Sequence, residues 1–349
     1  MDALMRAFST GPSYAWREPW NEWLGARDPE EALSWSHSGI AVTGAGDVVV
    51  MGNGRAEAHV LSADGRPLRS FETGVTQGHG LRIVEEEGAE VLWIADNGAR
   101  RRRDPDGTYP RVTGSGSPRV VKFALDGEQL LSLPAPDIEP YRTGTFSPTA
   151  VAVDEAAFGG NGDVWVADGY GQSYVHRFRR DGTYVMSLSG EEGAGRFKCP
   201  HAVWIDRRKE EPELYVTDRL NHRLQVFDLD GTFKRAVGDR SIFRRPGGLA
   251  VSQGCLVVAE LEARLAILGP DDELLGYLGA DDTVADRAGF PNQLGGDELP
   301  QRPAGLRPGY FNSPHGLVAD QLGNLYVTEF VIGGRVVKLD LGQGPGTTE

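Results

Sequence analysis

The stretch from Pro200 to Val237 decides the fold, because it holds four short strands in a row. It reads Pro200-His201-Ala202-Val203-Trp204-Ile205, then Glu213-Leu214-Tyr215-Val216-Thr217-Asp218, then Arg223-Leu224-Gln225-Val226-Phe227, then a turn at Asp230-Gly231 and a last run Phe233-Lys234-Arg235-Ala236-Val237. Alternating short runs of this kind are typical of strands, and Asp-Gly supplies the positive φ that a tight hairpin turn needs. The stretch predicts a four-stranded antiparallel sheet, which is one blade of a β-propeller.

Five further copies of this unit lie before and after it in the chain, at a period of roughly 45 to 60 residues. This period indicates stacked repeats and not a single irregular core. They open at Ser38-Gly39-Ile40, His79-Gly80-Leu81, Thr149-Ala150-Val151, Gly247-Gly248-Leu249 and His315-Gly316-Leu317. The sequence therefore predicts an all-β, six-bladed propeller with blades of four antiparallel strands.

The sixth copy ends near Leu341 without a fourth strand. An open blade would expose a sheet edge, so we expect the N-terminal segment to supply the missing strand and close the ring. The expected organisation is a closing segment at residues 1–36, a propeller at 37–341 and a disordered tail at 342–349. The long Asp-, Gly- and Pro-rich insert from about Ala280 to Phe311 is expected to form a rim loop, as a lid over one mouth of the channel.

The innermost strand of each blade lines the central channel. One equivalent residue per blade forms a ring in which histidine alternates with a smaller residue: Ser38, His79, Thr149, His201, Gly247 and His315. A single buried histidine is usually a hydrogen-bonded core residue. Three at equivalent positions, among seven in the chain, predict a metal site built by His79, His201 and His315. Three neutral imidazoles with an open position suit Zn²⁺, and ligand type leaves Fe²⁺ or Co²⁺ open.

The remaining histidines are assigned other places. His37 stands one residue before the ring position and is expected to point elsewhere. His59, His176 and His222 fall on outer strands or loops and are interpreted as structural or exposed.

An acid or base beside the metal is expected to come from the third copy. Tyr170 follows its second strand in Ala167-Asp168-Gly169-Tyr170, which makes it the catalytic candidate, with simple packing as the alternative. Arg55 and Arg142 are the cations that could bind a substrate carboxylate, and the residues alone do not choose between them.

Charge and composition exclude some partners. The net charge is −14, which argues against nucleic acid or an anionic membrane, and the basic run from Arg100 to Arg103 is interpreted as a solvated loop. No apolar run reaches the ~18 residues of a membrane span. Two cysteines, Cys199 and Cys255, are too few for a disulfide framework. We expect a cytoplasmic protein with a small-molecule or peptide-like substrate; nothing in the sequence points to an oligomeric state.

Several motifs resemble the peptidyl-α-hydroxyglycine α-amidating lyase, a six-bladed propeller of the NHL-repeat class. The resemblance runs from about Asp47 to Asp340 and is strongest in the third and fourth copies. It is carried by Ser147-Pro148-Thr149-Ala150-Val151-Ala152-Val153, Gly162-Asp163-Val164-Trp165-Val166-Ala167-Asp168-Gly169-Tyr170, Cys199-Pro200-His201 and Val216-Thr217-Asp218-Arg219. It implies zinc on His79, His201 and His315, Tyr170 as base, and cleavage of an α-hydroxyglycine carbinolamide into an amide and glyoxylate.

The chain departs from that family at four positions. Gly316 stands where the family has an aspartate of a calcium site, which argues against calcium here, and Ser313 replaces a methionine of the substrate pocket. Gly171 replaces a cysteine, so the family's disulfide is absent, in keeping with an intracellular protein. Arg55 matches the family's substrate-binding arginine only with a shift. The resemblance thus supports the metal site and the base more strongly than it supports a pocket for a peptide substrate.

Three functions are kept. The first is a zinc-dependent lyase acting on a carbinolamide or related hydroxylated substrate. The second is a non-catalytic NHL propeller that binds a protein or ligand. The third is a zinc hydrolase or hydratase that uses the same site.

Overall fold

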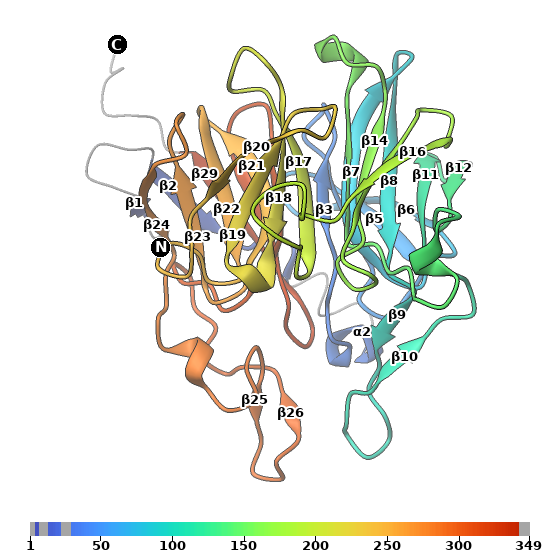
Figure 1. Cartoon of the computed structure of the whole chain (residues 1–349). Helices are drawn as coiled ribbons and strands as arrows, with labels where there is room; N and C mark the ends of the chain where they lie inside the picture. Colours follow the sequence, from blue (N-terminus) through green and yellow to red (C-terminus); the bar gives the residue numbers. More distant parts are fainter. Residues whose placement is uncertain (1–3, 7–12, 22–28, 342–349) are drawn as a thin grey trace.

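The inner strands of six antiparallel sheets stand next to one another around a central axis in the computed structural model, which describes residues 4–6, 13–21 and 29–341 (Figure 1). Each inner strand contacts the inner strand of the next sheet, and the last contacts the first, so the ring is closed. The prediction of an all-β, six-bladed propeller is confirmed.

The first three blades use consecutive strands except for one insertion in blade two. Their strands are, for blade one, β3 (Ile40–Val42), β4 (Val48–Met51), β5 (Glu57–Leu61) and β6 (Pro67–Glu72); for blade two, β7 (Gly78–Glu86), β8 (Ala89–Asp96), β11 (Arg119–Ala124) and β12 (Gln129–Leu133); and for blade three, β13 (Ala150–Val153), β14 (Val164–Ala167), β15 (Val175–Phe178) and β16 (Tyr184–Leu188).

The last three blades follow the same order until the chain ends. Their strands are, for blade four, β17 (Pro200–Asp206), β18 (Glu213–Asp218), β19 (Arg223–Phe227) and β20 (Phe233–Val237); for blade five, β21 (Pro246–Ser252), β22 (Cys255–Glu260), β23 (Arg264–Leu268) and β24 (Leu274–Leu278); and for blade six, β27 (Pro314–Ala319), β28 (Leu325–Glu329) and β29 (Arg335–Leu341).

The N-terminal strand completes the sixth blade. β2 (Ser13–Arg17) pairs antiparallel with β29, with Tyr14 opposite Leu341 and Arg17 opposite Lys338. β1 (Leu4–Arg6) adds a fifth strand outside it. The expectation that the N-terminal segment closes the ring is therefore confirmed, whereas the tail expected at 342–349 lies outside the described residues.

The core is distributed between the blades and does not form one central mass. Each large cluster of buried apolar side chains takes residues from two neighbouring blades, as Trp93 of blade two does with Val166 of blade three. This arrangement arises because each sheet packs against a neighbouring blade on both of its faces, so apolar side chains are needed on both faces. Among the described residues, none of these apolar clusters includes the ring residues, which lie around the axis.

Shorter elements gather on one face of the propeller (Figure 1). They are the helix α2 (Pro29–Leu33), the hairpin β9 (Ala99–Arg101) with β10 (Arg111–Thr113), and the pair β25 (Gln293–Leu294) with β26 (Pro300–Gln301). We call this side of the propeller the lid face. Short 3-10 turns occur at several other places in the chain, namely Glu139–Tyr141, Ala156–Phe158, Arg219–Asn221 and Val284–Asp286. Within the described residues, no helix is long and apolar enough to cross a membrane.

Candidate metal centre

The three ring histidines project toward the axis from matching places on three inner strands. Each is the second residue of its strand, in β7, β17 and β27. In each case the pairing with the next strand shifts register around the histidine, for example between Gly78 and Gly80. A bulge of this kind re-aims a side chain, which explains how the repeat directs imidazoles to the channel.

An acidic residue at the end of the second strand holds the backbone that leads into each ring position. In blade two, Asp96 accepts hydrogen bonds from the N–H groups of Thr76 at 2.9 Å and Gln77 at 3.1 Å. Blades three to six repeat the contact with Asp168, Asp218, Glu260 and Glu329, which accept from the N–H of Ser147, Lys198, Arg244 and Ser313. These buried carboxylates fix the backbone that leads into the ring residues, and they do so without a metal ion.

The imidazoles are neutral and turn the same nitrogen inward. His79 Nδ1–H donates to the Thr149 carbonyl at 2.6 Å, and His201 Nδ1–H donates to the Gly247 carbonyl at 3.0 Å. Since a carbonyl only accepts, the inward Nε2 atoms carry lone pairs. Burial lowers the pKa of His79 to about 3, and burial likewise holds the pKa values of His201 and His315 well below 6.5. Neutral imidazole is the ligand form.

Tyr170 reaches the same point from the loop after β14, as the sequence predicts. Its hydroxyl oxygen lies 3.2 Å from His79 Nε2 and 3.1 Å from His201 Nε2. Burial raises the pKa of Tyr170 to about 12, while the neighbouring Arg219 opposes that rise. Asp168 holds the loop by accepting from the N–H of Gln172 at 2.6 Å, so the phenol is rigidly placed over the imidazoles.

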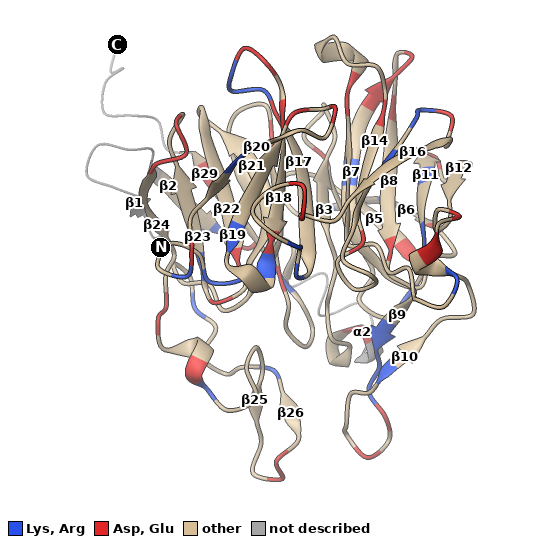
Figure 2. Ribbon diagram, in the orientation of Figure 1, with Lys and Arg blue, Asp and Glu red and all other residues tan. Residues whose placement is uncertain are grey.

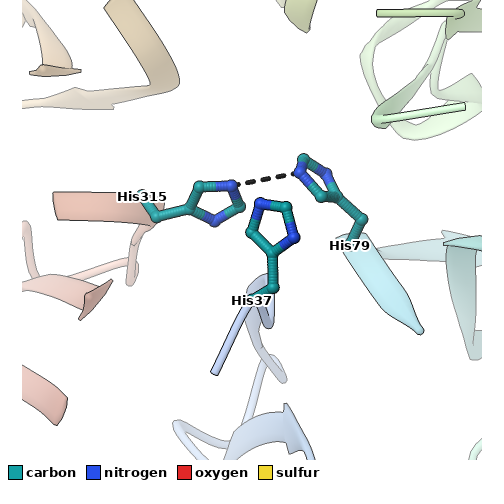
Figure 3. A group of neighbouring side chains, drawn as sticks. All are labelled: His37, His79 and His315. Carbon is teal, nitrogen blue, oxygen red and sulfur yellow. Dashed lines mark hydrogen bonds between the residues drawn. The ribbon is translucent and has the colours of Figure 1, made fainter. Parts of the chain in front are cut away.

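His37 also joins the cluster, and the expectation that it points elsewhere is wrong. Its ring centroid lies 4.5 Å from that of His79 and 4.6 Å from that of His315 (Figure 3). Its Nε2 lies 3.1 Å from the Tyr170 hydroxyl oxygen. A sequence signal existed: the residues that precede the other ring positions are all glycine or proline, namely Gly78, Pro148, Pro200, Pro246 and Pro314.

The cation next to Tyr170 is one that sequence reasoning left without a role. Arg219 Nη1–H donates to the Tyr170 hydroxyl at 3.2 Å. Asp218, its neighbour in the chain, pairs with Arg223 at 2.8 Å, and among the described residues the Arg219 Nε–H has no hydrogen-bond partner. The tripeptide Thr217-Asp218-Arg219 was a motif of the resemblance, and the 3-10 turn at Arg219–Asn221 brings the guanidinium over the axis.

The two arginines chosen from the sequence are both exposed residues. Arg55 Nε is 3.8 Å from Glu31 Oε1, and 55% of the Arg55 side chain is exposed. Arg142 is an exposed residue at the end of the turn Glu139–Tyr141. The hairpin β9–β10 instead presents Arg111 about 6.0 Å from the Tyr170 ring centroid. Figure 2 shows the basic residues of both hairpin strands on the lid face. A substrate-binding role for Arg55 stays a prediction.

The remaining histidines behave as expected from their strands. His59 and His176 are fully buried in the third strands of blades one and three, and His222 is half-buried in a loop, where its Nε2 lies 2.8 Å from Arg240 Nη1.

The donor set fits a metal ion. Tyr170 has one hydroxyl hydrogen, yet three Nε2 atoms surround its oxygen, and His315 Nε2 faces His79 Nε2 at 3.1 Å. Converging lone pairs in a buried place are stabilised by a cation, and imidazole is a ligand for Zn²⁺, Fe²⁺ and similar ions. The cluster can therefore bind a metal, whose identity the geometry leaves open.

The position of the family's calcium-binding aspartate has little space. A Cβ on Gly316 would lie 2.5 Å from Thr328 Oγ1 and 3.1 Å from the Gly39 Cα. An aspartate would force the inner strands apart at this point. The expectation against calcium stays a prediction, and this packing supports it.

An axial cavity of about 610 Å³ meets the three ring histidines. The cavity runs along the inner strands toward their far ends, where Ile83, Val153 and Ile205 are among its walls. Tyr170 and His37 do not line it, so they cover the histidines from the lid face while the cavity reaches them from the other side.

Relatives of known sequence share the repeat. The chain is 27% identical to NHL repeat-containing protein 3 of Mus musculus over 175 residues, which is 49% of this chain and 45% of that protein. It is also 27% identical to peptidyl-glycine alpha-amidating monooxygenase of Mus musculus over 344 residues, which is 88% of this chain and 32% of that protein. The chain thus spans less than half the length of these relatives. No family model matches the sequence.

Solved structures show the same fold at lower sequence identity. A streptogramin B lyase superimposes with a TM-score of 0.59 at 14% identity, covering 97% of this chain and 100% of that one. A gluconolactonase from Xanthomonas campestris gives a TM-score of 0.56 at 14% identity, covering 96% and 92%. Together, the repeat, the closed ring of six blades and the sequence relatives make this chain an NHL-like β-propeller.

Proposed function

We propose that this protein is a metal-dependent lyase that cleaves a carbinolamide of the α-hydroxyglycine type into an amide and an aldehyde. The observation that carries the proposal is the meeting of three ring histidines with the Tyr170 hydroxyl, at 3.1–3.2 Å from His79 and His201. The sequence match to the amidating monooxygenase over 88% of the chain supports this reaction class.

The reaction requires little rearrangement of atoms. The hydroxyl proton of the substrate leaves, its C–O bond becomes C=O, the C–N bond breaks, and the amide nitrogen takes up a proton. A metal held by His79, His201 and His315, with Zn²⁺ as the first expectation, would supply a Lewis acid to polarise the substrate oxygen. The protein then has to remove one proton and return one.

Tyr170 is suited to move that proton. Its oxygen is the only side-chain hydroxyl of the described residues within hydrogen-bond distance of the histidine Nε2 atoms. Burial alone makes the phenolate unfavourable, because it raises the pKa of Tyr170 to about 12. The N–H of Arg219, at 3.2 Å, favours the phenolate, and a bound metal cation would favour it further. Tyr170 therefore accepts the hydroxyl proton as a base and can return it to the leaving amide.

The substrate has room on the axis. The cavity of about 610 Å³ that meets the ring histidines accommodates the part of the substrate beyond the reacting carbon. A carboxylate on that carbon needs a cation, for which Arg55 from the sequence and Arg111 from the hairpin are the two candidates to exchange. The departures at Ser313 and Gly316 make a small substrate preferable to a peptide as the first choice for assay.

Turnover of N-benzoyl-α-hydroxyglycine to benzamide and glyoxylate tests the proposal. We expect the wild-type protein to contain a transition metal and to release glyoxylate, and Tyr170→Phe to keep the metal while kcat falls by about 10²–10⁴. Tyr310→Phe, which changes an exposed tyrosine, is the matched control and should retain full activity.

The other outcomes separate the alternatives. A protein without metal, unaffected by His201→Ala, would leave only a non-catalytic propeller. A metal-containing protein that hydrolyses esters or lactones, yet leaves the carbinolamide intact, would assign the same site to a hydrolase.

A further inference from the structure

We propose that His37 is a fourth imidazole ligand of the metal, so that the resting centre holds four histidines. This inference rests on the metal centre of the proposed function and specifies its ligands. The segment that carries His37 precedes the inner strand of blade one, outside the three strands that supply the ring histidines.

The geometry places His37 among possible ligands. One ring nitrogen of each of His37, His79 and His315 lies within 4.8 Å of the other two, and these three residues form a group that could hold a metal ion (Figure 3). His37 and His201 both approach the Tyr170 hydroxyl oxygen, each through Nε2 at 3.1 Å. His79 and His315, two of the predicted ligands, are thus direct neighbours of His37, and His201, the third, approaches the same Tyr170 oxygen.

Hydrogen bonds behind the ring turn its lone pair inward. Asn97 Oδ1 accepts from the N–H of Ala99 at 3.0 Å, which orients the Asn97 amide. Asn97 Nδ2–H then donates to Gln77 Oε1 at 3.1 Å, so that this Gln77 atom is an acceptor. His37 Nδ1 lies 3.2 Å from the same oxygen and must donate to it. The hydrogen therefore sits on Nδ1, and Nε2 is free to bind a metal.

This arrangement repeats the pattern of the ring histidines. His79 and His201 also donate from Nδ1 to a backbone oxygen and present Nε2. Hydrogen bonds to the outer ring nitrogen are usual for metal-binding histidines, because they set the tautomer and the ring plane. A histidine that only accepted the Tyr170 proton would leave the lone pairs of His79 and His201 facing that oxygen without a hydrogen of their own.

Four imidazoles also restrict the metal. Zn²⁺ is usually four-coordinate, so four histidine ligands would close its shell and leave no position for substrate. A divalent first-row ion that accepts five or six ligands, such as Fe²⁺ or Co²⁺, keeps positions open beside the same four nitrogens. Under this proposal the site would favour such an ion over Zn²⁺, which three histidine ligands alone would suit.

X-ray absorption on protein loaded with Co²⁺ alone counts the imidazoles. We expect four in the wild type and three in His37→Phe, with Co²⁺ affinity lowered by about tenfold or more, since even outer partners of ligating histidines cost 10–100-fold. His222→Asn is the control: it removes a histidine outside the cluster, at a left-handed position (φ 56°) that asparagine tolerates. It should change neither quantity.

A second variant guards against misfolding of the first. Gln77→Met removes the acceptor behind His37 while leaving all four histidines in place, and it should also weaken Co²⁺ binding. Three imidazoles in the wild type, with the same affinity in both variants, would overturn the proposal even if the carbinolamide is turned over. A wild-type protein that binds no Co²⁺, Fe²⁺ or Zn²⁺ would remove the proposed function along with it.

Discussion

At the scale of single residues, the glycine that follows a ring position matters as much as the ring residue. A Cβ on Gly80 would lie 2.5 Å from the Thr149 carbonyl oxygen and 2.8 Å from the Ala150 Cα. Both atoms belong to backbone that cannot move aside cheaply. The inner strands of blades two and three can approach the axis this closely only because Gly80 has no side chain.

We therefore expect Gly80→Ala to lower the free energy of unfolding by about 1–3 kcal/mol, the usual cost of overpacking. Gly296→Ala, where an added Cβ meets nothing within 4 Å, should leave stability nearly unchanged. Urea denaturation of both variants measures the difference. Equal midpoints would show that the inner strands separate at no cost.

The candidate site could be predicted from the sequence where the repeat itself carries the information. His79, His201 and His315 occupy equivalent positions, so closing the ring brings them together. Tyr170 was found from its place after a strand end. His37 was expected to point elsewhere and Arg219 was given no role, because His37 lies in the segment before β3 and Arg219 begins a short 3-10 turn, both outside the strand positions that the repeat defines.

At the scale of elements, a buried carboxylate forms ion pairs that connect two strands of one blade. Glu213 of β18 pairs with Arg235 of β20 at 2.6 Å and with Lys234 at 2.8 Å. Burial alone would raise the pKa of Glu213, but the hydrogen bonds from Arg235 and Lys234 outweigh it and lower the pKa to about 2. Because the folded pKa lies below the ordinary glutamate value of 4.5, these ion pairs stabilise the fold above that pH.

That stabilisation should disappear as the pH falls from about 4.5 to about 2, since the folded protein then loses its advantage in holding the carboxylate ionised. Glu213→Gln should accordingly be less stable than the wild type at pH 6, with a gap that narrows toward pH 3. Chemical denaturation at both values measures it, with Glu72→Gln on exposed β6 as the control. If the difference in stability between Glu213→Gln and the wild type stayed constant with pH, the substitution would have removed packing and not a charge interaction.

The elements that sequence reasoning missed are those outside the repeat. The hairpin β9–β10 interrupts blade two between its second and third strands, and β10 is exposed throughout. Without a buried face it shows no apolar alternation, so Arg100–Arg103 was interpreted as a solvated loop. In the fold, Arg101, Arg102 and Arg103 are exposed as expected, while Arg101 belongs to β9 and its guanidinium lies 4.9 Å from the Trp35 ring centroid. The propeller strands were predictable because burial on both sides imposes alternation on them.

At the scale of the whole molecule, stability depends on the contact that joins the two ends of the chain. β2 supplies the fourth strand of blade six, and Trp16 is its main anchor. The Trp16 side chain is 3% exposed and packs 4.8 Å from Phe311, between ring centroids. Arg335 lies 5.0 Å from the Trp16 ring centroid. If this anchor is lost, β29 becomes a free edge, and free edges pair with other chains.

Trp16→Ala should therefore act on more than its own cluster. We expect a loss of about 3–5 kcal/mol in the free energy of unfolding, as for other buried tryptophans, and association that increases with protein concentration below the unfolding temperature. Leu322→Ala, at a side chain that is 74% exposed, should show neither effect. Thermal unfolding with light scattering follows both quantities at once. A destabilised variant that does not associate would indicate that β29 keeps its partner, and that Trp16 stabilises blade six without holding the ring closed.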